Sequence, residues 1–247
     1  MSAPVFLLEP ELAARAREGG SLDLVGPEGR HAASVRRIRA GEPIELVDGL
    51  GRRIVGRVTG VERSGCTIAV ERIVEEPPEH PRITAVQAIA KGDRGELAVQ
   101  MMTEAGVDSV IPWQAEHSVA RWEGDRAVKH RDRWALTAQE AAKQARRAWV
   151  PTIGSPITSA AVADLIANAG VALVLDERST VPITSIDFST AHDVIVIIGP
   201  EGGLSENERT MFEDAGADLV RLGSTVLRTS TAGVVALGVV MARVGRW

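Results

Sequence analysis

The chain has 247 residues, of which 45% are hydrophobic, and a formal net charge of −5. This length and composition suit one large or two modest globular domains with a proper core. A single cysteine, Cys66, excludes an internal disulfide framework, and the five histidines are scattered without metal-ligand spacing. We therefore expect neither a structural nor a catalytic metal.

Targeting and membrane signals are not evident in the sequence. The start, Met1–Pro4, lacks the basic stretch and the apolar core of a signal peptide. The longest apolar stretch, Ala232–Ala242, is shorter than the ~20 residues that span a bilayer. We expect a cytoplasmic protein with no membrane partner.

A proline-rich segment at 75–81 is the best candidate for a domain boundary, since it has no apolar periodicity. Before it, strands are expected at Ile44–Val47 and Arg53–Val61 around a turn at Asp48-Gly49, and at Cys66–Ile73. Together these strands predict a small β-barrel.

After the boundary, strand and helix patterns alternate, which is typical of an α/β sheet with parallel pairing. The expected strands are Ile83–Ala90, Ser109–Ile111, Val171–Leu175 and Asp193–Ile198, and the expected helices are Glu96–Glu104 and Ala127–Ala148. In the second of these helices, Trp134, Ala138, Ala141, Ala145 and Ala148 define one small-residue face that should pack against a partner.

Two glycine-rich loops are the most informative feature of the sequence. The first, Gly199–Glu208, follows the apolar run 193–198, whose lack of alternation indicates a strand buried on both faces. Glycines allow positive φ and close backbone approach, and Ser205 with Glu208 predicts a capping box that starts a helix.

The second loop, Leu222–Gly233, repeats this design after Asp218–Arg221, with Gly223 as its pivot and a helix from about Thr229 to Arg243. Ligands of open parallel sheets bind outside the carboxyl ends of the strands, where both loops fall. Neither a phosphate-loop nor a dinucleotide motif follows a strand here. The pair predicts a pocket for a nucleotide-like ligand held without a phosphate cradle.

Positive charge is concentrated locally despite the net negative charge. Between Arg121 and Trp149 there are eight Lys or Arg residues against four acids, and between Arg30 and Arg39 there are four arginines and no acid. Local patches of this kind determine phosphate binding. Tyrosine is absent and phenylalanine is rare, so we expect RNA recognition by shape and phosphate contacts without an aromatic stacking platform.

Four ordered blocks of sequence resemble the bacterial 16S ribosomal RNA uridine methyltransferases of the RsmE type, within the SPOUT class of S-adenosylmethionine enzymes. The resemblance spans nearly the whole chain. The blocks are His31–Arg37, Ala90–Asp93 followed by Thr103–Val107, Gly199–Gly203, and Leu222-Gly223 with Leu227–Thr229. The chain departs from the family at Ser230, where a glutamate is usual, and at Ala105, where a leucine is usual.

The resemblance implies the architecture of the whole chain. It implies a PUA-like β-barrel RNA-binding domain at residues 1–74, a linker at 75–81 and a SPOUT methyltransferase domain at 82–247. That domain would be α/β, with a mostly parallel sheet and a carboxyl-terminal trefoil knot. The apolar helix that starts near Thr229 is either a core helix or, as the resemblance favours, a homodimer contact.

The implied reaction moves a methyl group from S-adenosylmethionine to the ring imide nitrogen N3 of a specific uridine of 16S rRNA, uridine 1498 in the family. The partner would be 16S rRNA in the assembled small ribosomal subunit. Positioning and charge stabilisation should dominate catalysis. Arg228 is the first candidate for stabilising the uracil anion, and Glu201 is a candidate for binding a ligand amine or hydroxyl or for accepting the proton. Bracing of the loops is the competing role for both residues.

Two sets of binding residues are expected. Cofactor contacts are assigned to Leu175, Ile198, Gly199, Pro200, Glu201, Gly202, Leu222, Gly223, Leu227 and Arg228. RNA contacts are assigned to Arg36, Arg37, Arg39, Lys91, Arg126, Lys129 and Arg133. Two alternatives stay open: a ribose 2′-O-methyltransferase acting on rRNA or tRNA, and an RNA-binding ribosome assembly factor without catalysis.

Overall fold

The computed structural model describes residues 3–189 and 191–247, so the first two residues of the predicted amino-terminal domain lie outside the described residues. The chain divides into two compact units, one formed by residues 1–78 and 142–150 and the other by residues 79–141 and 151–247. The division predicted from the sequence, with a linker at 75–81, stays a prediction about folding domains. The predicted division did not place Ala142–Val150 with the amino-terminal residues, as the structure does.

The amino-terminal unit is built on a five-stranded sheet in the described residues, with the order β1-β3-β4-β5-β2. β1 and β3 pair in parallel and the other neighbours are antiparallel. Its elements are β1 (Val5–Leu7), α1 (Pro10–Arg15), β2 (Ser21–Leu24), α2 (Gly26–Arg30), the π-helix η1 (His31–Val35), β3 (Pro43–Val47), β4 (Arg52–Glu62) and β5 (Gly65–Glu75).

Alternation along these strands explains the core of this unit. Ile44 and Leu46 of β3 and Ile54 and Val58 of β4 are buried in one cluster with Ile68 of β5, because every second residue of a strand faces the same side. The three strands predicted here are confirmed, and they are longer than predicted by one, two and three residues in chain order.

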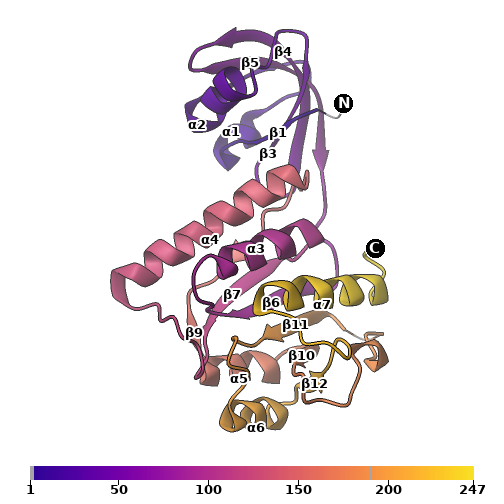
Figure 1. Ribbon diagram of the computed structural model, residues 1–247. Coiled ribbons are helices and arrows are strands. Elements are labelled where there is room, and N and C mark those ends of the chain that lie inside the picture. Colours follow the sequence, from indigo (N-terminus) through magenta and orange to yellow (C-terminus); the bar gives the residue numbers. More distant parts are fainter. Residues whose placement is uncertain (1–2, 190) are drawn as a thin grey trace. The chain divides into compact units, whose positions relative to one another are not determined.

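The carboxyl-terminal unit is an α/β layer structure (Figure 1). Its strands are β6 (Arg82–Ala88), β7 (Ser109–Gln114), β8 (Thr152–Ile153), β9 (Ile157–Thr158), β10 (Val171–Leu175), β11 (Asp193–Ile198) and β12 (Asp218–Val220). Its helices are α3 (Arg94–Ala105), α4 (Gly124–Gln144), α5 (Ser159–Ala167), the 3₁₀ turn η2 (Ile183–Ser185), α6 (Glu206–Asp214) and α7 (Thr229–Arg243).

The sheet of this unit runs β12-β10-β11-β6-β7-β8, with β9 also on β7, and every pairing in the described residues is parallel. Helices cover both faces, with α3 and α7 on one side and α5 and α6 on the other (Figure 1). Val194, Val196 and Ile198 pack in the first layer and Ile195 and Ile197 in the second. The predicted α/β fold with a mostly parallel sheet is confirmed, and so is the strand buried on both faces.

Some predicted boundaries are wrong: β6 ends two residues before Ala90, β7 continues three residues beyond Ile111, and the long helix does not continue to Ala148. α4 ends at Gln144 because Arg146 has a left-handed backbone with φ of 58°. The amide of Arg146 then donates to the carbonyl of Lys143, at 3.1 Å, and that of Arg147 to the carbonyl of Ala142, at 2.9 Å. This is a Schellman motif, which usually has glycine at the left-handed position. Because position 146 is arginine, the usual signal for this helix end is missing from the sequence.

Candidate active site

The candidate site is a cavity of about 660 Å³ within the carboxyl-terminal unit. It lies where β10, β11 and β12 end, and parallel neighbours place those ends at one edge of the sheet. Three loops line it, namely 175–178 after β10, 198–204 after β11 and 220–228 after β12. Arg94 of α3 and the start of α7 complete the wall.

All the residues expected to contact a cofactor line this one cavity. They are Leu175, Ile198, Gly199, Pro200, Glu201, Gly202, Leu222, Gly223, Leu227 and Arg228. The loop after β10 was missed apart from Leu175, since Asp176, Glu177 and Arg178 follow a strand without any glycine signal. The structure therefore brings these residues together in the wall of one cavity.

The first loop is held by its capping box, which the structure confirms. The hydroxyl of Ser205 accepts from the amide of Glu208, and the Glu208 carboxylate accepts from the amide of Ser205, both at 3.1 Å. The same carboxylate, 2% exposed, also accepts from the amide of Glu116 and the hydroxyl of Ser159, both at 2.7 Å. Glu208 therefore ties the loop to two distant segments that the sequence could not reveal.

A buried hydrogen-bond chain joins the bases of the two glycine loops. The Thr229 hydroxyl donates to the Gly199 carbonyl at 2.8 Å and accepts from the Gln87 side-chain amide at 2.9 Å. Gln87 is fully buried on β6, and the position of its amide nitrogen follows from these partners. This chain fixes the first residue of α7, and with it the neighbouring Arg228, against the end of β11.

Two glycines of the loops differ in their backbone conformation. Gly203 has a φ of 70°, a left-handed backbone that other residues adopt at a cost. Gly223 has no such backbone, and a Cβ built on it meets nothing within 4 Å. Gly199 and Gly202 do not use the positive φ that glycine allows, because in the first loop the described backbone has it at Gly203 alone. Within the described residues, neither the backbone conformation nor a close neighbour requires glycine at 223.

The cavity carries charge of both signs. Asp176 is buried, and its carboxylate accepts from the amide of Arg178 at 2.9 Å and from Nε of Arg209 at 2.7 Å. The hydrogen bond from Arg178 to Glu206 raises the pKa of that guanidinium above its ordinary value, so Arg178 stays cationic. Glu201 and Arg228 are exposed residues of the wall.

The two departures from the family pattern lie away from the cavity wall. Ser230 is 4% exposed in the first turn of α7, between Thr229, which lines the cavity, and Thr231. Ala105 is buried at the end of α3. Neither residue is among those that line the cavity.

The residues expected to contact RNA are all exposed, and they fall in both units. Lys91, Arg126, Lys129 and Arg133 belong to the carboxyl-terminal unit, and Nη2 of Arg133 lies 3.2 Å from Oε1 of Glu96. Arg36, Arg37 and Arg39 follow the π-helix of the amino-terminal unit, and Arg37 has a φ of 53°. Single-turn π-helices are frequent at functional sites.

The described residues contain neither a candidate metal site nor a candidate membrane span. No group of three or more His, Cys, Asp or Glu side chains there could hold a metal ion. Within the same part of the chain, each helix is too short or too polar to cross a membrane.

Two regions of the chain match known families and define its class. Residues 77–241 match the RNA methyltransferase domain, and residues 24–71 match the RNA methyltransferase PUA domain. The chain is thus an RNA methyltransferase by family, with a PUA domain before the catalytic one, as predicted.

Relatives define the family further. The chain is 43% identical over 226 residues to ribosomal RNA small subunit methyltransferase E of Mycobacterium tuberculosis, covering 90% of this chain and 86% of that protein. It is 27% identical over 231 residues to the Bacillus subtilis protein of the same name, covering 90% of each. The chain belongs to the ribosomal RNA small subunit methyltransferase E family, and the predicted family is confirmed.

Solved structures agree with this assignment. The Neisseria gonorrhoeae ribosomal RNA small subunit methyltransferase E, bound to S-adenosylmethionine, superposes with a TM-score of 0.87 at 26% identity and covers 98% of each chain. A Legionella pneumophila methyltransferase in complex with the same cofactor gives the same TM-score, identity and coverage.

Proposed function

We propose that this protein transfers a methyl group from S-adenosylmethionine to N3 of a uridine of 16S rRNA, uridine 1498 in the family, within the small ribosomal subunit. The observation that carries the proposal is the cavity at the strand ends, which unites every residue expected to contact the cofactor. Relatives named as small subunit methyltransferases and a structure with bound S-adenosylmethionine support it.

The chemistry of the cavity fits this cofactor. Ile198, Leu222 and Leu227 offer apolar surface to an adenine ring, and the loop backbones offer amides and carbonyls to its edge. The space at Gly223 admits a ligand against the backbone. Arginines and carboxylates of the wall match the carboxylate and the amine of the methionine moiety. When bound, the cofactor supplies an activated methyl group on a sulfonium.

The chain's own residues then have to position the uracil and stabilise the charge that develops on it. Loss of the imide proton leaves an anion on the uracil, and the Arg228 guanidinium at the cavity wall lowers the pKa of that imide by opposite charge. Arg228 adjoins Thr229, whose hydrogen bonds hold it at the end of β11. Glu201 is exposed on the opposite loop, where a carboxylate can bind a cofactor group or accept the proton.

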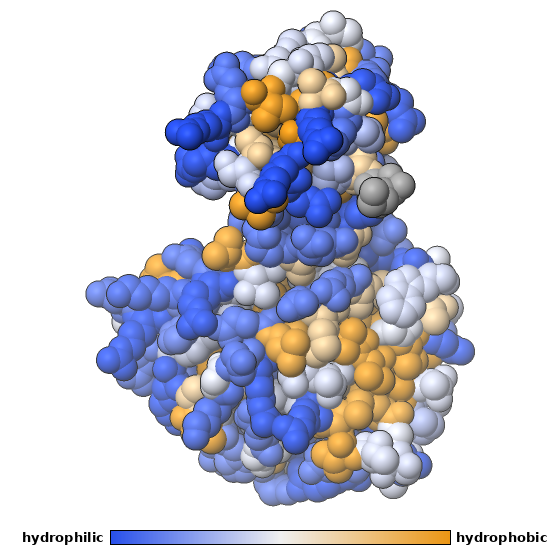
Figure 2. All heavy atoms as spheres, turned by 45° about the horizontal axis from the view of Figure 1, so that its top comes forward, coloured by the Kyte–Doolittle hydropathy of each residue, from blue (hydrophilic) through white to orange (hydrophobic). Residues whose placement is uncertain are grey.

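We propose further that the exposed arginines and lysines assigned above contact rRNA phosphate. We also propose that two copies of the chain associate through α7. Apolar residues gather on the side of the carboxyl-terminal unit where α7 lies (Figure 2), and Val235 of that helix is 43% exposed. Exposed apolar patches of this kind mark association surfaces. The carboxyl-terminal trefoil knot is a separate part of the proposal and rests on the family resemblance alone. A substrate in the ribosome places the protein in the cytoplasm.

The test is nucleoside mass spectrometry of 16S rRNA from a strain that lacks this protein. We expect 3-methyluridine to disappear and to return when the gene is restored. Unchanged 3-methyluridine with loss of a ribose methyl mark would favour the 2′-O-methyltransferase. A fully unchanged set of methyl marks would favour the assembly factor without catalysis.

A further inference from the structure

A second cavity lies in the carboxyl-terminal unit, outside the site described above. Its volume is about 400 Å³, and residues of the turn after β6, of the start of α3 and of the approach to α4 line it, together with residues of α4 itself. Pockets for small ligands start at about 300 Å³, so a single nucleobase fits this volume. None of the residues expected to contact the cofactor lines it.

Aromatic rings form part of the wall of this cavity. Trp122 is stacked on His130, with ring centroids 5.1 Å apart and an interplanar angle of 16°. Trp134 meets Trp122 edge to face at 4.9 Å and is 1% exposed. A Cβ at Gly95 would come within 2.6 Å of the Trp134 ring, so the glycine is what admits that ring against α3. Trp122 and His130 are only half-buried, which leaves ring surface for a ligand.

The charges around the rings suit a polyanion. Arg121 and Arg133 line the cavity, and Glu96 is the one acid among the residues of its wall. Lys129, beside His130 on α4, and Lys91, beside Gly92, are exposed. A positive surface combined with aromatic rings is the combination by which proteins hold single-stranded nucleic acid.

The turn at the start of α3 contributes residues to both cavities. Arg94 lines the first cavity, while Gly92, Gly95 and Glu96 line the second. One short stretch of backbone therefore contributes to both.

We propose that the second cavity binds one unstacked base of the substrate RNA strand, held against the Trp122–His130 pair, close to the nucleotide that is methylated. This inference rests on the proposed function for the identity of the RNA. It differs from the expectation of RNA recognition by shape and phosphate alone, because stacking of splayed bases on aromatic side chains is the usual mode of reading single-stranded RNA.

The first test is steady-state methylation of small ribosomal subunits purified from a strain that lacks this enzyme. Trp122→Ala should raise KM for the subunit about tenfold, the effect of one lost stacked base, while Trp122→Phe stays near the wild type. The Kd for S-adenosylmethionine should not change in either variant. Trp247→Ala is the control, since Trp247 is 69% exposed and lies in neither cavity. An unchanged KM in Trp122→Ala would overturn the proposal.

The second test needs no variant and so does not depend on folding of a mutant. Ultraviolet cross-linking of the wild-type protein to the same subunits, followed by peptide mass spectrometry, should place a nucleotide adduct on Trp122 or His130. Adducts found only on other peptides would refute the base site. If the subunit gains no methyl group from the wild type, the proposed function fails, while the cross-link still decides whether a base binds here.

Discussion

At the scale of single residues, the sequence predicted the residues of the cavity wall better than the hydrogen-bonding partners that hold the wall in place. Glycines, a capping box and an arginine after a strand are local signals, and so the first cavity could be outlined in advance. Asp176 and the chain from Gln87 to Thr229 join residues far apart in sequence. Nothing in a local pattern shows such partners, which is why those residues were missed.

Arg228 gives the sharpest prediction at this scale. Arg228→Ala should lower kcat by about 10²–10³, the cost of removing one charged group that stabilises the transition state, with little change in the Kd for the RNA substrate. Arg228→Lys should retain part of the activity, because it keeps the charge but loses the planar fork. The measurement is single-turnover methylation of small ribosomal subunits.

The control for this variant is Arg63→Ala, which removes an exposed arginine of the turn between β4 and β5 that does not line the cavity. It should behave as the wild type. If Arg228→Ala folds and keeps full activity, Arg228 only braces the loop, which is the competing role considered from the sequence.

At the scale of elements, the strands of the parallel sheet and the helices around it were predictable, because hydrophobic periodicity and the glycine and proline residues between elements define them. Errors arose where an end depends on backbone geometry, as at Arg146, or where an element is too short to show a pattern, as with β8 and β9. Ion pairs that fasten elements together were also beyond prediction. The one around Asp108 is the clearest example.

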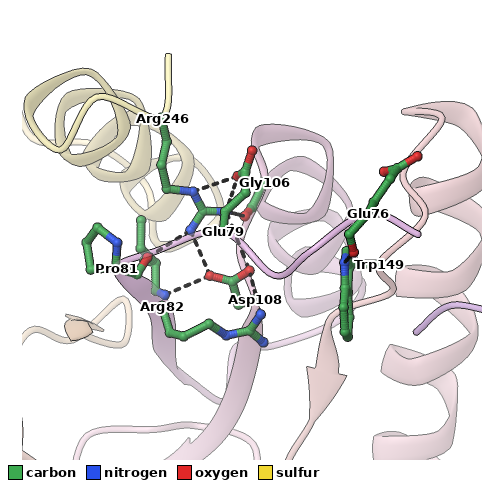
Figure 3. Close-up of polar contacts among 9 residues, drawn as sticks. Glu76, Glu79, Pro81, Arg82, Gly106, Asp108, Trp149 and Arg246 are labelled. Atoms are coloured by element: carbon green, nitrogen blue, oxygen red, sulfur yellow. Dashed lines mark hydrogen bonds and ion pairs between the residues drawn. The ribbon is translucent and has the colours of Figure 1, made fainter. Parts of the chain in front are cut away.

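Asp108 joins the end of the chain to the start of the sheet (Figure 3). Its carboxylate accepts from the amide of Ile83 at 2.8 Å and from Nη1 of Arg246 at 2.7 Å. Arg246 also donates to the carbonyls of Pro81 and Gly106, at 3.1 and 3.0 Å, and both charged side chains are almost fully buried. The cluster therefore fixes the segment after α7 against β6 and β7.

Breaking this cluster should destabilise the carboxyl-terminal unit. Asp108→Asn leaves the buried Arg246 with only the exposed Glu79 as its counter-ion, and we expect the free energy of unfolding to fall by about 3 kcal/mol in urea denaturation. The exposed pair of Arg131 with Asp132 is the matched comparison, since its loss in Arg131→Ala should cost at most about 1 kcal/mol. Equal losses in the two variants would show that the Asp108 cluster contributes no more than a surface pair.

At the scale of the whole molecule, the family resemblance predicted a PUA-like domain followed by a methyltransferase domain. Physical patterns alone gave an α/β sheet with parallel pairing and a pocket at its carboxyl edge. The assignment of Ala142–Val150 to the amino-terminal unit could not be foreseen, because its contacts include Lys143 with Glu28 and Trp149 with the carbonyl of Glu76. The knot and the dimer stay predictions that rest on the family.

The account as a whole depends on the cavity between the glycine loops holding S-adenosylmethionine. Calorimetric titration of the wild type and of Gly223→Val tests this most directly, because the added side chain enters open space without straining the backbone. We predict one site per chain in the wild type, at least about tenfold weaker binding in the variant, and the same melting temperature for both. A wild type that binds no S-adenosylmethionine, or a Gly223→Val variant that binds it equally well, would contradict the account.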